Sequence, residues 1–256
     1  MSAARQRPAV VELFVARFTE TDRNQWLANA SHWLVDAERA RAEAITDLQA
    51  RTLHATGRAL TRLIAAARRG GDPREFRIDH TDEGKPFLAD HLDLWINVAH
   101  AGNVVAVVVS EDASVGVDVE QSAETRISPR TLAGRRFAPA EAEYLGTLPP
   151  EAVKDEFLRF WTVKEAVAKA LGRSIFDALS GVVLEPQKGG LRLASVWAGP
   201  PADQWTVHQL AAPGGDECLA IAVAAPGATV TGVQQVRCEA LAAGDLAAAA
   251  PPSSQD

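Results

Sequence analysis

The residues that most constrain the fold are 104–110, because their sequence VVAVVVS is apolar at six consecutive positions. A half-exposed strand carries a polar residue at every second position, whereas a strand buried on both faces is a continuous apolar run. Residues 94–100 and 115–120 on either side are also apolar and strand-like, and they are joined to the middle run by short turns. We therefore predict three strands, with residues 104–110 as the central one.

Helical and strand patterns alternate along the rest of the chain. Residues 10–18 predict an opening strand, and helical spacing runs from residue 24 to a stop at the Gly-Gly-Asp-Pro sequence that begins at Gly70. Further helical patterns cover residues 128–148 and 157–171. Four short strand patterns follow, at residues 182–184, 191–194, 205–210 and 218–224.

This order of elements predicts an α+β fold made of two halves that meet near residue 120. We assign residues 1–120 to the first half and 121–238 to the second, although no residue-level repeat relates them. A cleft between two such halves is the usual place for a ligand. Residues 239–256 are rich in alanine, proline and serine, and we expect them to be disordered.

Composition and charge exclude several classes of protein. The 256 residues are 47% apolar and carry a formal net charge of −7, which disfavours nucleic acid as the main partner. No stretch approaches 18 apolar residues, and the N-terminus lacks the pattern of an export signal. Only two cysteines are present, far apart, so we expect neither a disulfide framework nor a structural zinc site. These features predict a cytoplasmic protein without a membrane segment.

The charge of residues 38–77 is positive, unlike that of the whole chain, because this segment contains nine arginines and only five acidic residues. Such a run forms either a solvated helix face or a binding site for a small polyanion. Both interpretations stay open at this point.

Two carboxylates share one face of the predicted strand at residues 115–120, which has the sequence VGVDVE. Strand alternation places Asp118 and Glu120 on the same side, with Cα atoms about 6.6 Å apart. Oxygen ligands alone suit Mg²⁺ or Mn²⁺. The pattern is common, however, and a solvated strand face would look the same.

The helix predicted at residues 157–171 also gathers charge on one face. Trp161, Glu165 and Lys169 lie one turn apart, with Lys164 beside them. A surface pair between Glu165 and Lys169 would contribute only about 0.2–0.5 kcal/mol. The lysines are nevertheless unusual, because the chain has 21 arginines but only five lysines, and a third one, Lys85, lies in a Gly-Lys-Pro loop.

Four motifs, in the order GKP, N-x-x-H, G-V-D-V-E and W-x-x-K-E-A-x-x-K, span residues 84–169. In this order and spacing they resemble the Sfp-type phosphopantetheinyl transferases. The resemblance implies two fused, pseudo-symmetric α+β halves with the active site in the cleft between them. It further implies a monomeric, cytoplasmic transferase of the holo-[acyl-carrier-protein] synthase type, which could serve secondary metabolite biosynthesis. Such an enzyme moves the 4′-phosphopantetheine group of coenzyme A to a serine of an apo acyl or peptidyl carrier protein, depends on Mg²⁺ and releases 3′,5′-ADP.

The resemblance also implies roles for individual residues. Asp118, Glu120 and Glu165 would bind Mg²⁺, or Mn²⁺ in its place, together with the pyrophosphate of coenzyme A. Glu141, in the segment RFAPAE, looks like the glutamate that deprotonates the acceptor serine, and Glu165 and Lys169 are also assigned to catalysis. The residues implied in cofactor binding are Arg51, Lys85, Pro86, His100, Lys164 and Lys169.

The chain departs from the family pattern at three places. RFAPAE has one aromatic residue where relatives commonly have two, which makes Glu143 a rival to Glu141. The two lie about 200° apart on a helix, so only one can face the cleft, and Pro139 at the helix start favours Glu141. Ala99 replaces a serine and Ser174 a glycine, and both changes concern cofactor affinity more than the reaction.

Two other functions remain compatible with the sequence. One is a coenzyme A or nucleotide binding protein without turnover, and the other is a metal-dependent phosphohydrolase. The presence of all three carboxylates and Glu141 disfavours the first. No motif indicates the second metal ion that a phosphohydrolase would use to activate water. The sequence also leaves open which carrier protein a transferase would modify.

Overall fold

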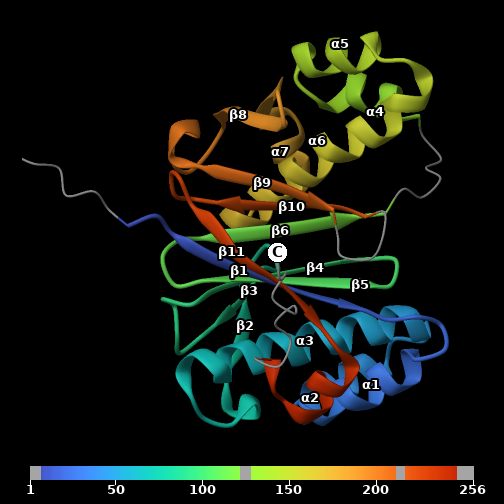
Figure 1. Ribbon diagram of the computed structural model, residues 1–256, viewed down its shortest axis with the longest axis vertical. Coiled ribbons are helices and arrows are strands. Elements are labelled where there is room, and N and C mark those ends of the chain that lie inside the picture. Colours follow the sequence, from blue (N-terminus) through green and yellow to red (C-terminus); the bar gives the residue numbers. More distant parts are fainter. Residues whose placement is uncertain (1–6, 122–127, 212–216, 247–256) are drawn as a thin grey trace, which may run out of the picture.

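The computed structural model describes residues 7–121, 128–211 and 217–246. Its elements form a mixed α+β fold, which confirms the predicted class (Figure 1). The strands are β1 (Val10–Arg17), β2 (Ile78–His80), β3 (Pro86–Leu88), β4 (Trp95–Ala101), β5 (Val104–Ser110), β6 (Val115–Glu120), β7 (Val182–Gln187), β8 (Gly190–Val196), β9 (Thr206–Ala211), β10 (Cys218–Val223) and β11 (Thr229–Val236). The helices are α1 (Arg23–His32), α2 (Asp36–Glu43), α3 (Leu48–Arg69), α4 (Pro129–Arg136), α5 (Pro139–Thr147), α6 (Pro150–Leu171), α7 (Ile175–Gly181) and α8 (Cys238–Ala243).

The first sheet has the strand order β11-β1-β5-β4. Every residue of β5 is buried, which confirms residues 104–110 as a central strand. Val105, Val107 and Val109 face the core beneath α1 and α3. The alternate residues, led by Val104 and Val108, face a second core shared with β6 and β10. The continuous apolar run is therefore explained by burial on both faces.

The second sheet, in the order β6-β10-β9, corrects the predicted pairing of residues 115–120. β6 does not continue the first sheet but pairs antiparallel with β10, and α6 packs against both strands. The two sheets meet where the side-chain Oδ1 of Asn97 in β4 accepts a 3.0 Å hydrogen bond from the backbone N–H of Val117. The backbone therefore passes from the first sheet to the second between β5 and β6, and the division of the chain into two pseudo-symmetric halves stays a prediction.

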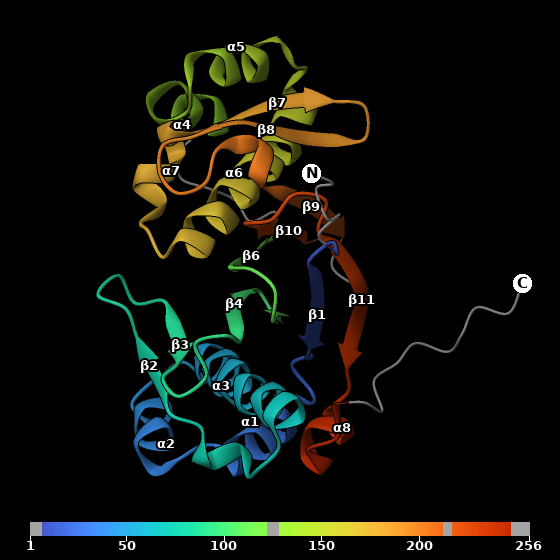
Figure 2. The same ribbon diagram turned by 90° about the vertical axis from the view of Figure 1, so that its left-hand side faces the viewer.

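The C-terminal residues return to the first half. β11 pairs parallel with β1, and α8 packs against α1 (Figure 2). The indole N–H of Trp33 donates a 2.7 Å hydrogen bond to the carbonyl oxygen of Leu241, and the side chains of Leu241 and Leu246 are buried. The predicted disorder is therefore wrong for residues 239–246, because these residues complete the first core, while 247–256 lie outside the described residues.

The arginine-rich region forms two helices after α1 rather than one long one. α2 ends before residue 44, and α3 begins where the side chain of Asp47 accepts a 2.7 Å hydrogen bond from the N–H of Ala50. None of the helices in the described part of the chain has the length and apolarity needed to cross a bilayer.

Candidate active site

The sequence alternation of β6 sets the direction of its carboxylates. The valines of β6 lie in the core between the sheets, so Asp118 and Glu120 point to the opposite face, towards α6. β6 can approach α6 closely because Gly116 has no side chain. Asp118 is 3% exposed and lies opposite Ala220 of β10, whereas Glu120 at the strand end is more exposed. The strand therefore presents one buried and one accessible carboxylate.

Helix α6 supplies the other charged side chains. Trp161, Glu165 and Lys169 follow at intervals of four residues, and the helix ends at Gly172, whose φ of 64° lies in the left-handed region that glycine adopts without strain. The indole N–H of Trp161 donates a 3.1 Å hydrogen bond to Glu165. The Nζ of Lys169 lies 2.7 Å from Asp118 Oδ1 and 3.4 Å from Glu165 Oε1.

Strand and helix together form a cluster of three carboxylates. Asp118, Glu120 and Glu165 each offer an oxygen, and these oxygens lie within 4.8 Å of one another. Burial raises the pKa of Asp118 to about 7, even though the Lys169 ammonium opposes the shift and Glu165 adds to it. Burial also raises the pKa of Glu120, and Glu165 contributes. Lys169 is one ammonium beside three carboxylates, so the cluster keeps an excess of negative charge.

This cluster fits a hard divalent cation such as Mg²⁺ or Mn²⁺. All three donors are oxygens, which such ions prefer. The Oδ2 atom of Asp118 is buried and has no hydrogen-bond partner among the described residues, so it is available to coordinate a cation. A cation held by Asp118, Glu120 and Glu165 would satisfy this atom and offset the excess charge.

Trp161 is the hydrogen-bond donor that orients Glu165. We expect Trp161→Phe, which keeps the ring but removes the N–H, to lower the affinity of the cluster for Mg²⁺ about tenfold, because a hydrogen bond to a charged group is lost. Mg²⁺ binding is measured by titration calorimetry. Trp197→Phe is the matched control, since Trp197 follows β8 and lies outside the cluster. Equal Mg²⁺ affinity of the two variants would contradict this role for Trp161.

A cavity of about 300 Å³ lies beside the cluster and is lined by both halves. Lys85, Pro86 and Asn97 come from the first half, while Glu165 and Lys169 come from α6. The Nζ of Lys85 donates a 2.8 Å hydrogen bond to the carbonyl oxygen of Ala170 and lies 3.4 Å from Ser114 Oγ. Burial lowers the pKa of Lys85 to about 8. This ammonium has no carboxylate within ion-pair distance among the described residues, so it can take an anionic ligand.

His100 lies near the end of β4, where desolvation and then the charge of Lys169 lower its pKa. His54 on α3 is close enough that His100 contributes to lowering its pKa, after burial and Arg58. Arg51 is on the same helix, and its Nε donates to the carbonyl oxygen of Ile45 at 2.8 Å. The two histidines thus lie between Lys169 and α3, whereas Arg51 contacts the loop before that helix.

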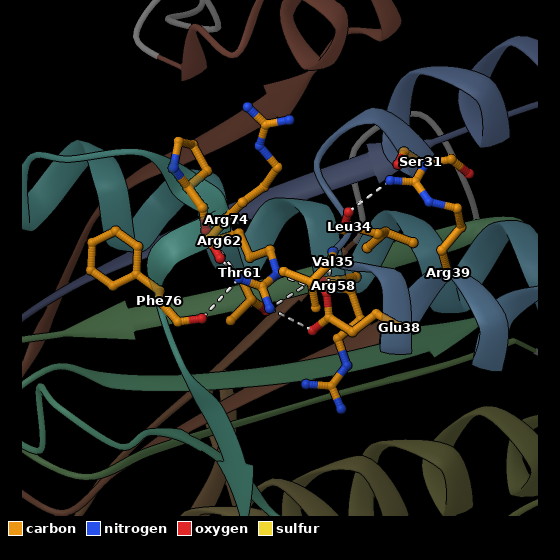
Figure 3. Close-up of polar contacts among 12 residues, drawn as sticks. Ser31, Leu34, Val35, Glu38, Arg39, Arg58, Thr61, Arg62, Arg74 and Phe76 are labelled. Atoms are coloured by element: carbon orange, nitrogen blue, oxygen red, sulfur yellow. Dashed lines mark hydrogen bonds and ion pairs between the residues drawn. The ribbon is translucent and has the colours of Figure 1, made fainter.

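Other arginines of this region are structural. Arg62 is 3% exposed, and its guanidinium binds both carboxylate oxygens of Glu38 at 2.7 and 3.0 Å. It also donates to the carbonyl oxygen of Phe76 at 2.8 Å, so it joins α2, α3 and the segment before β2 (Figure 3). Arg39 caps carbonyl oxygens at the end of α1. The local excess of arginine is therefore partly a buried scaffold, and neither sequence interpretation describes it fully.

Glu141 and Lys164, both predicted for the site, are not brought to the carboxylate cluster. Glu141 lies in the first turn of α5 as expected, but its side chain is 1% exposed and forms an ion pair with Lys164, whose side chain is 0% exposed. Lys164 therefore does not lie along the cavity, contrary to the prediction. Glu143 is exposed on α5, as the helical spacing implied.

Asn97 and Ser114 were missed by sequence reasoning. Asn97 lines the cavity and joins the two sheets, and Ser114 donates a 2.7 Å hydrogen bond to the carbonyl oxygen of Ala170. Asn97 stands in the N-x-x-H motif, where a buried amide in a strand was a usable signal. Ser114 lies in a turn, and no sequence pattern identifies it.

Comparison with known proteins decides the family. A family model described as the 4′-phosphopantetheinyl transferase superfamily matches residues 114–223, from the turn before β6 to the end of β10. The 4′-phosphopantetheinyl transferase HetI of Nostoc sp. (strain PCC 7120) is 31% identical over 166 residues, which cover 63% of this chain and 70% of HetI. The chain belongs to the 4′-phosphopantetheinyl transferase superfamily.

Other members of the superfamily match shorter stretches. The 4′-phosphopantetheinyl transferase AcpT of Escherichia coli (strain K12) is 33% identical over 103 residues, which are 40% of this chain and 52% of AcpT. The 4′-phosphopantetheinyl transferase of Bacillus subtilis is 29% identical over 121 residues, 46% of this chain and 51% of that protein. The superfamily match includes all three clustered carboxylates, whereas Lys85 and His100 lie outside it.

Proposed function

We propose that the protein transfers the 4′-phosphopantetheine group of coenzyme A to a serine of an apo acyl or peptidyl carrier protein in an Mg²⁺-dependent reaction. The observation that carries this proposal is the cluster of Asp118, Glu120 and Glu165 beside Lys169, at a cavity between the two halves. Membership of the superfamily and the names of the relatives supply the reaction class.

In the proposed reaction, the serine oxygen of the carrier protein forms a bond to the β-phosphorus of coenzyme A. The bond from that phosphorus to the bridging oxygen breaks, 3′,5′-ADP leaves, and the serine proton passes to a base. A divalent cation held by the three carboxylates would neutralise charge on the pyrophosphate and on the leaving group.

The chain's own cations complete the charge balance. Lys169 lies between Asp118 and Glu165, so its ammonium is fixed at the edge of the cluster and can donate to a phosphate oxygen. Lys85 and His100 offer further donors for the phosphates of the cofactor. Ser114 and the end of α6 hold Lys85 in place, because both accept from its ammonium.

The test is incubation of the protein with coenzyme A, Mg²⁺ and several apo carrier proteins, followed by mass spectrometry. We expect one carrier serine to gain a phosphopantetheine group and 3′,5′-ADP to appear in equal amount, and EDTA to stop both. Binding of coenzyme A without either product would instead indicate a binding protein. Release of phosphate from nucleotides without carrier modification would indicate a phosphohydrolase.

We expect Lys85→Met to raise the KM for coenzyme A about tenfold and to change kcat less than twofold, because one charge-assisted hydrogen bond to the cofactor is lost. Lys188→Met is the matched control, since Lys188 lies exposed in the turn between β7 and β8. Dephospho-coenzyme A identifies the contact: if the substitution penalises both cofactors equally, Lys85 does not bind the 3′-phosphate.

A further inference from the structure

The carboxylate of Glu141 is enclosed, and both of its oxygens accept hydrogen bonds from the protein. Its Oε2 accepts hydrogen bonds from the N–H of Ala138 at 2.9 Å and from Lys164 Nζ at 2.9 Å. Its Oε1 accepts from the N–H of Leu184 at 2.7 Å. The side chain is 1% exposed. A serine hydroxyl brought by a carrier protein therefore has no path to either oxygen in this arrangement.

Lys164 is saturated in the same way. An ammonium has three protons to donate, and Lys164 has three acceptors: Glu141, the carbonyl oxygen of Leu179 at 3.0 Å and the carbonyl oxygen of Val182. The ring of Phe137 lies 4.8 Å from the Nζ atom and adds a cation–π contact. No proton of Lys164 is left for a phosphate.

The pair connects the start of α5, the middle of α6, the end of α7 and the start of β7. Lys164 directly precedes Glu165 in α6, and consecutive helical residues point about 100° apart. When Lys164 is anchored in the core of the second half, rotation of α6 about its axis is fixed. Glu165 is then held towards Asp118 and Glu120 on β6.

From these contacts we infer that Glu141 and Lys164 form a positioning pair that aims Glu165 at the carboxylate cluster, and that Glu141 does not accept the serine proton. The link to serine rests on the proposed function, whereas the pair itself does not. Glu141 acts through Lys164 and the helix, and the serine proton leaves to a group that solvent can reach.

The first test needs no catalysis and uses the native protein without ligands. Surface carboxylates are coupled to glycine ethyl ester with a carbodiimide, and modified peptides are quantified by mass spectrometry over time. We expect Glu143, which is exposed on the same helix, to react at least tenfold faster than Glu141. Equal rates for the two residues would overturn the inference, since Glu141 would then be accessible.

The second test separates positioning from base catalysis with Glu141→Gln and Glu141→Gln/Lys164→Met. The single variant leaves a buried ammonium without its counter-charge, so we expect its Tm to fall by about 10 °C. We expect its half-saturating Mg²⁺ concentration to rise about tenfold as Glu165 loses its orientation. The double variant removes both charges, and we expect it to recover most of the Tm and of the Mg²⁺ affinity, with kcat within about tenfold of the wild type.

A general base behaves differently under the same substitutions. It would lose about 10²–10⁴-fold in kcat in both variants, with unchanged Tm and no rescue by Lys164→Met, and this result would overturn the inference. An unchanged Mg²⁺ requirement in Glu141→Gln would overturn the positioning role. If the wild type fails to modify any carrier protein, the proposed function fails, while labelling and Tm still test the pair.

Discussion

Asp118→Asn is expected to reduce transfer at least 10³-fold without destabilising the protein in the absence of metal. Asparagine keeps the shape of the side chain but removes one of the three carboxylates of the cluster. Two remaining carboxylates would hold a divalent cation less firmly, so less of the cation would be in place to neutralise the pyrophosphate. Transfer to an apo carrier protein is the measurement, and Asp203→Asn, an exposed position before β9, is the matched control.

The stability half of this prediction follows from the pKa of Asp118, which rises from 3.8 to about 7 in the folded state. A raised carboxyl pKa means that the folded protein binds the proton more tightly than the unfolded chain. Stability of the metal-free protein therefore falls as the pH rises from about 4 to about 7. Asparagine does not ionise, so the Tm of Asp118→Asn in EDTA should depend less on pH than that of the wild type.

The outcome that would contradict this account is a loss of more than about 5 °C in Tm at pH 7.5 in EDTA. Such a loss would mean that the ion pair with Lys169 stabilises the fold more than burial of Asp118 costs. Lys169 keeps Glu165 as a partner at 3.4 Å, which is why we expect no such loss.

Gly116→Ala is expected to destabilise the protein by about 3–5 kcal/mol, because an added methyl group in this contact has no space. A Cβ atom at residue 116 would lie 2.0 Å from the carbonyl oxygen of Ala166 and 2.5 Å from the backbone nitrogen of Ala170. Both neighbours are backbone atoms of α6, so β6 and α6 would have to separate. We expect a fall in Tm of about 10 °C and a loss of activity at temperatures where the variant is still folded.

Gly134→Ala is the matched control for this substitution. Gly134 lies in α4 and has no atom within 4 Å of the position that a Cβ would occupy. Alanine favours helix over glycine, so this variant should gain about 0.5–1 kcal/mol. A wild-type Tm for Gly116→Ala would show that β6 and α6 do not touch as described.

Periodicity predicted the parts of the site that lie on regular elements. Alternation placed Asp118 and Glu120 on one face of a strand, and helical spacing placed Trp161, Glu165 and Lys169 on one face of a helix. These rules depend only on local geometry, which is why they hold without knowledge of the partners. The structure brings the two faces together at the cluster.

Contacts between distant residues could not be predicted in this way. Lys164 lies on the same helix as Glu165, beside the carboxylate cluster. The neighbouring sequence does not show whether such a lysine is buried against Glu141 or exposed to a ligand. The pairing of β6 with β10 was also missed, because the short turn at residues 111–114 suggested a continuous meander. β11 was not predicted, because its apolar and polar residues alternate only weakly and its partner, β1, is about 220 residues away in the sequence.

The parallel pairing of β11 with β1 determines how the chain can be divided. The backbone passes from the first half to the second between β5 and β6, and returns between β10 and β11. A single proteolytic cut in one of these two connections would leave the halves covalently joined through the second connection. A fragment ending after β5 would lack both β11 and α8, so one edge of β1 would be open to pairing with other chains. The segment from β6 to β10 is therefore continuous and can be cut out by truncation, whereas the first half is discontinuous and needs β11 and α8 joined to it.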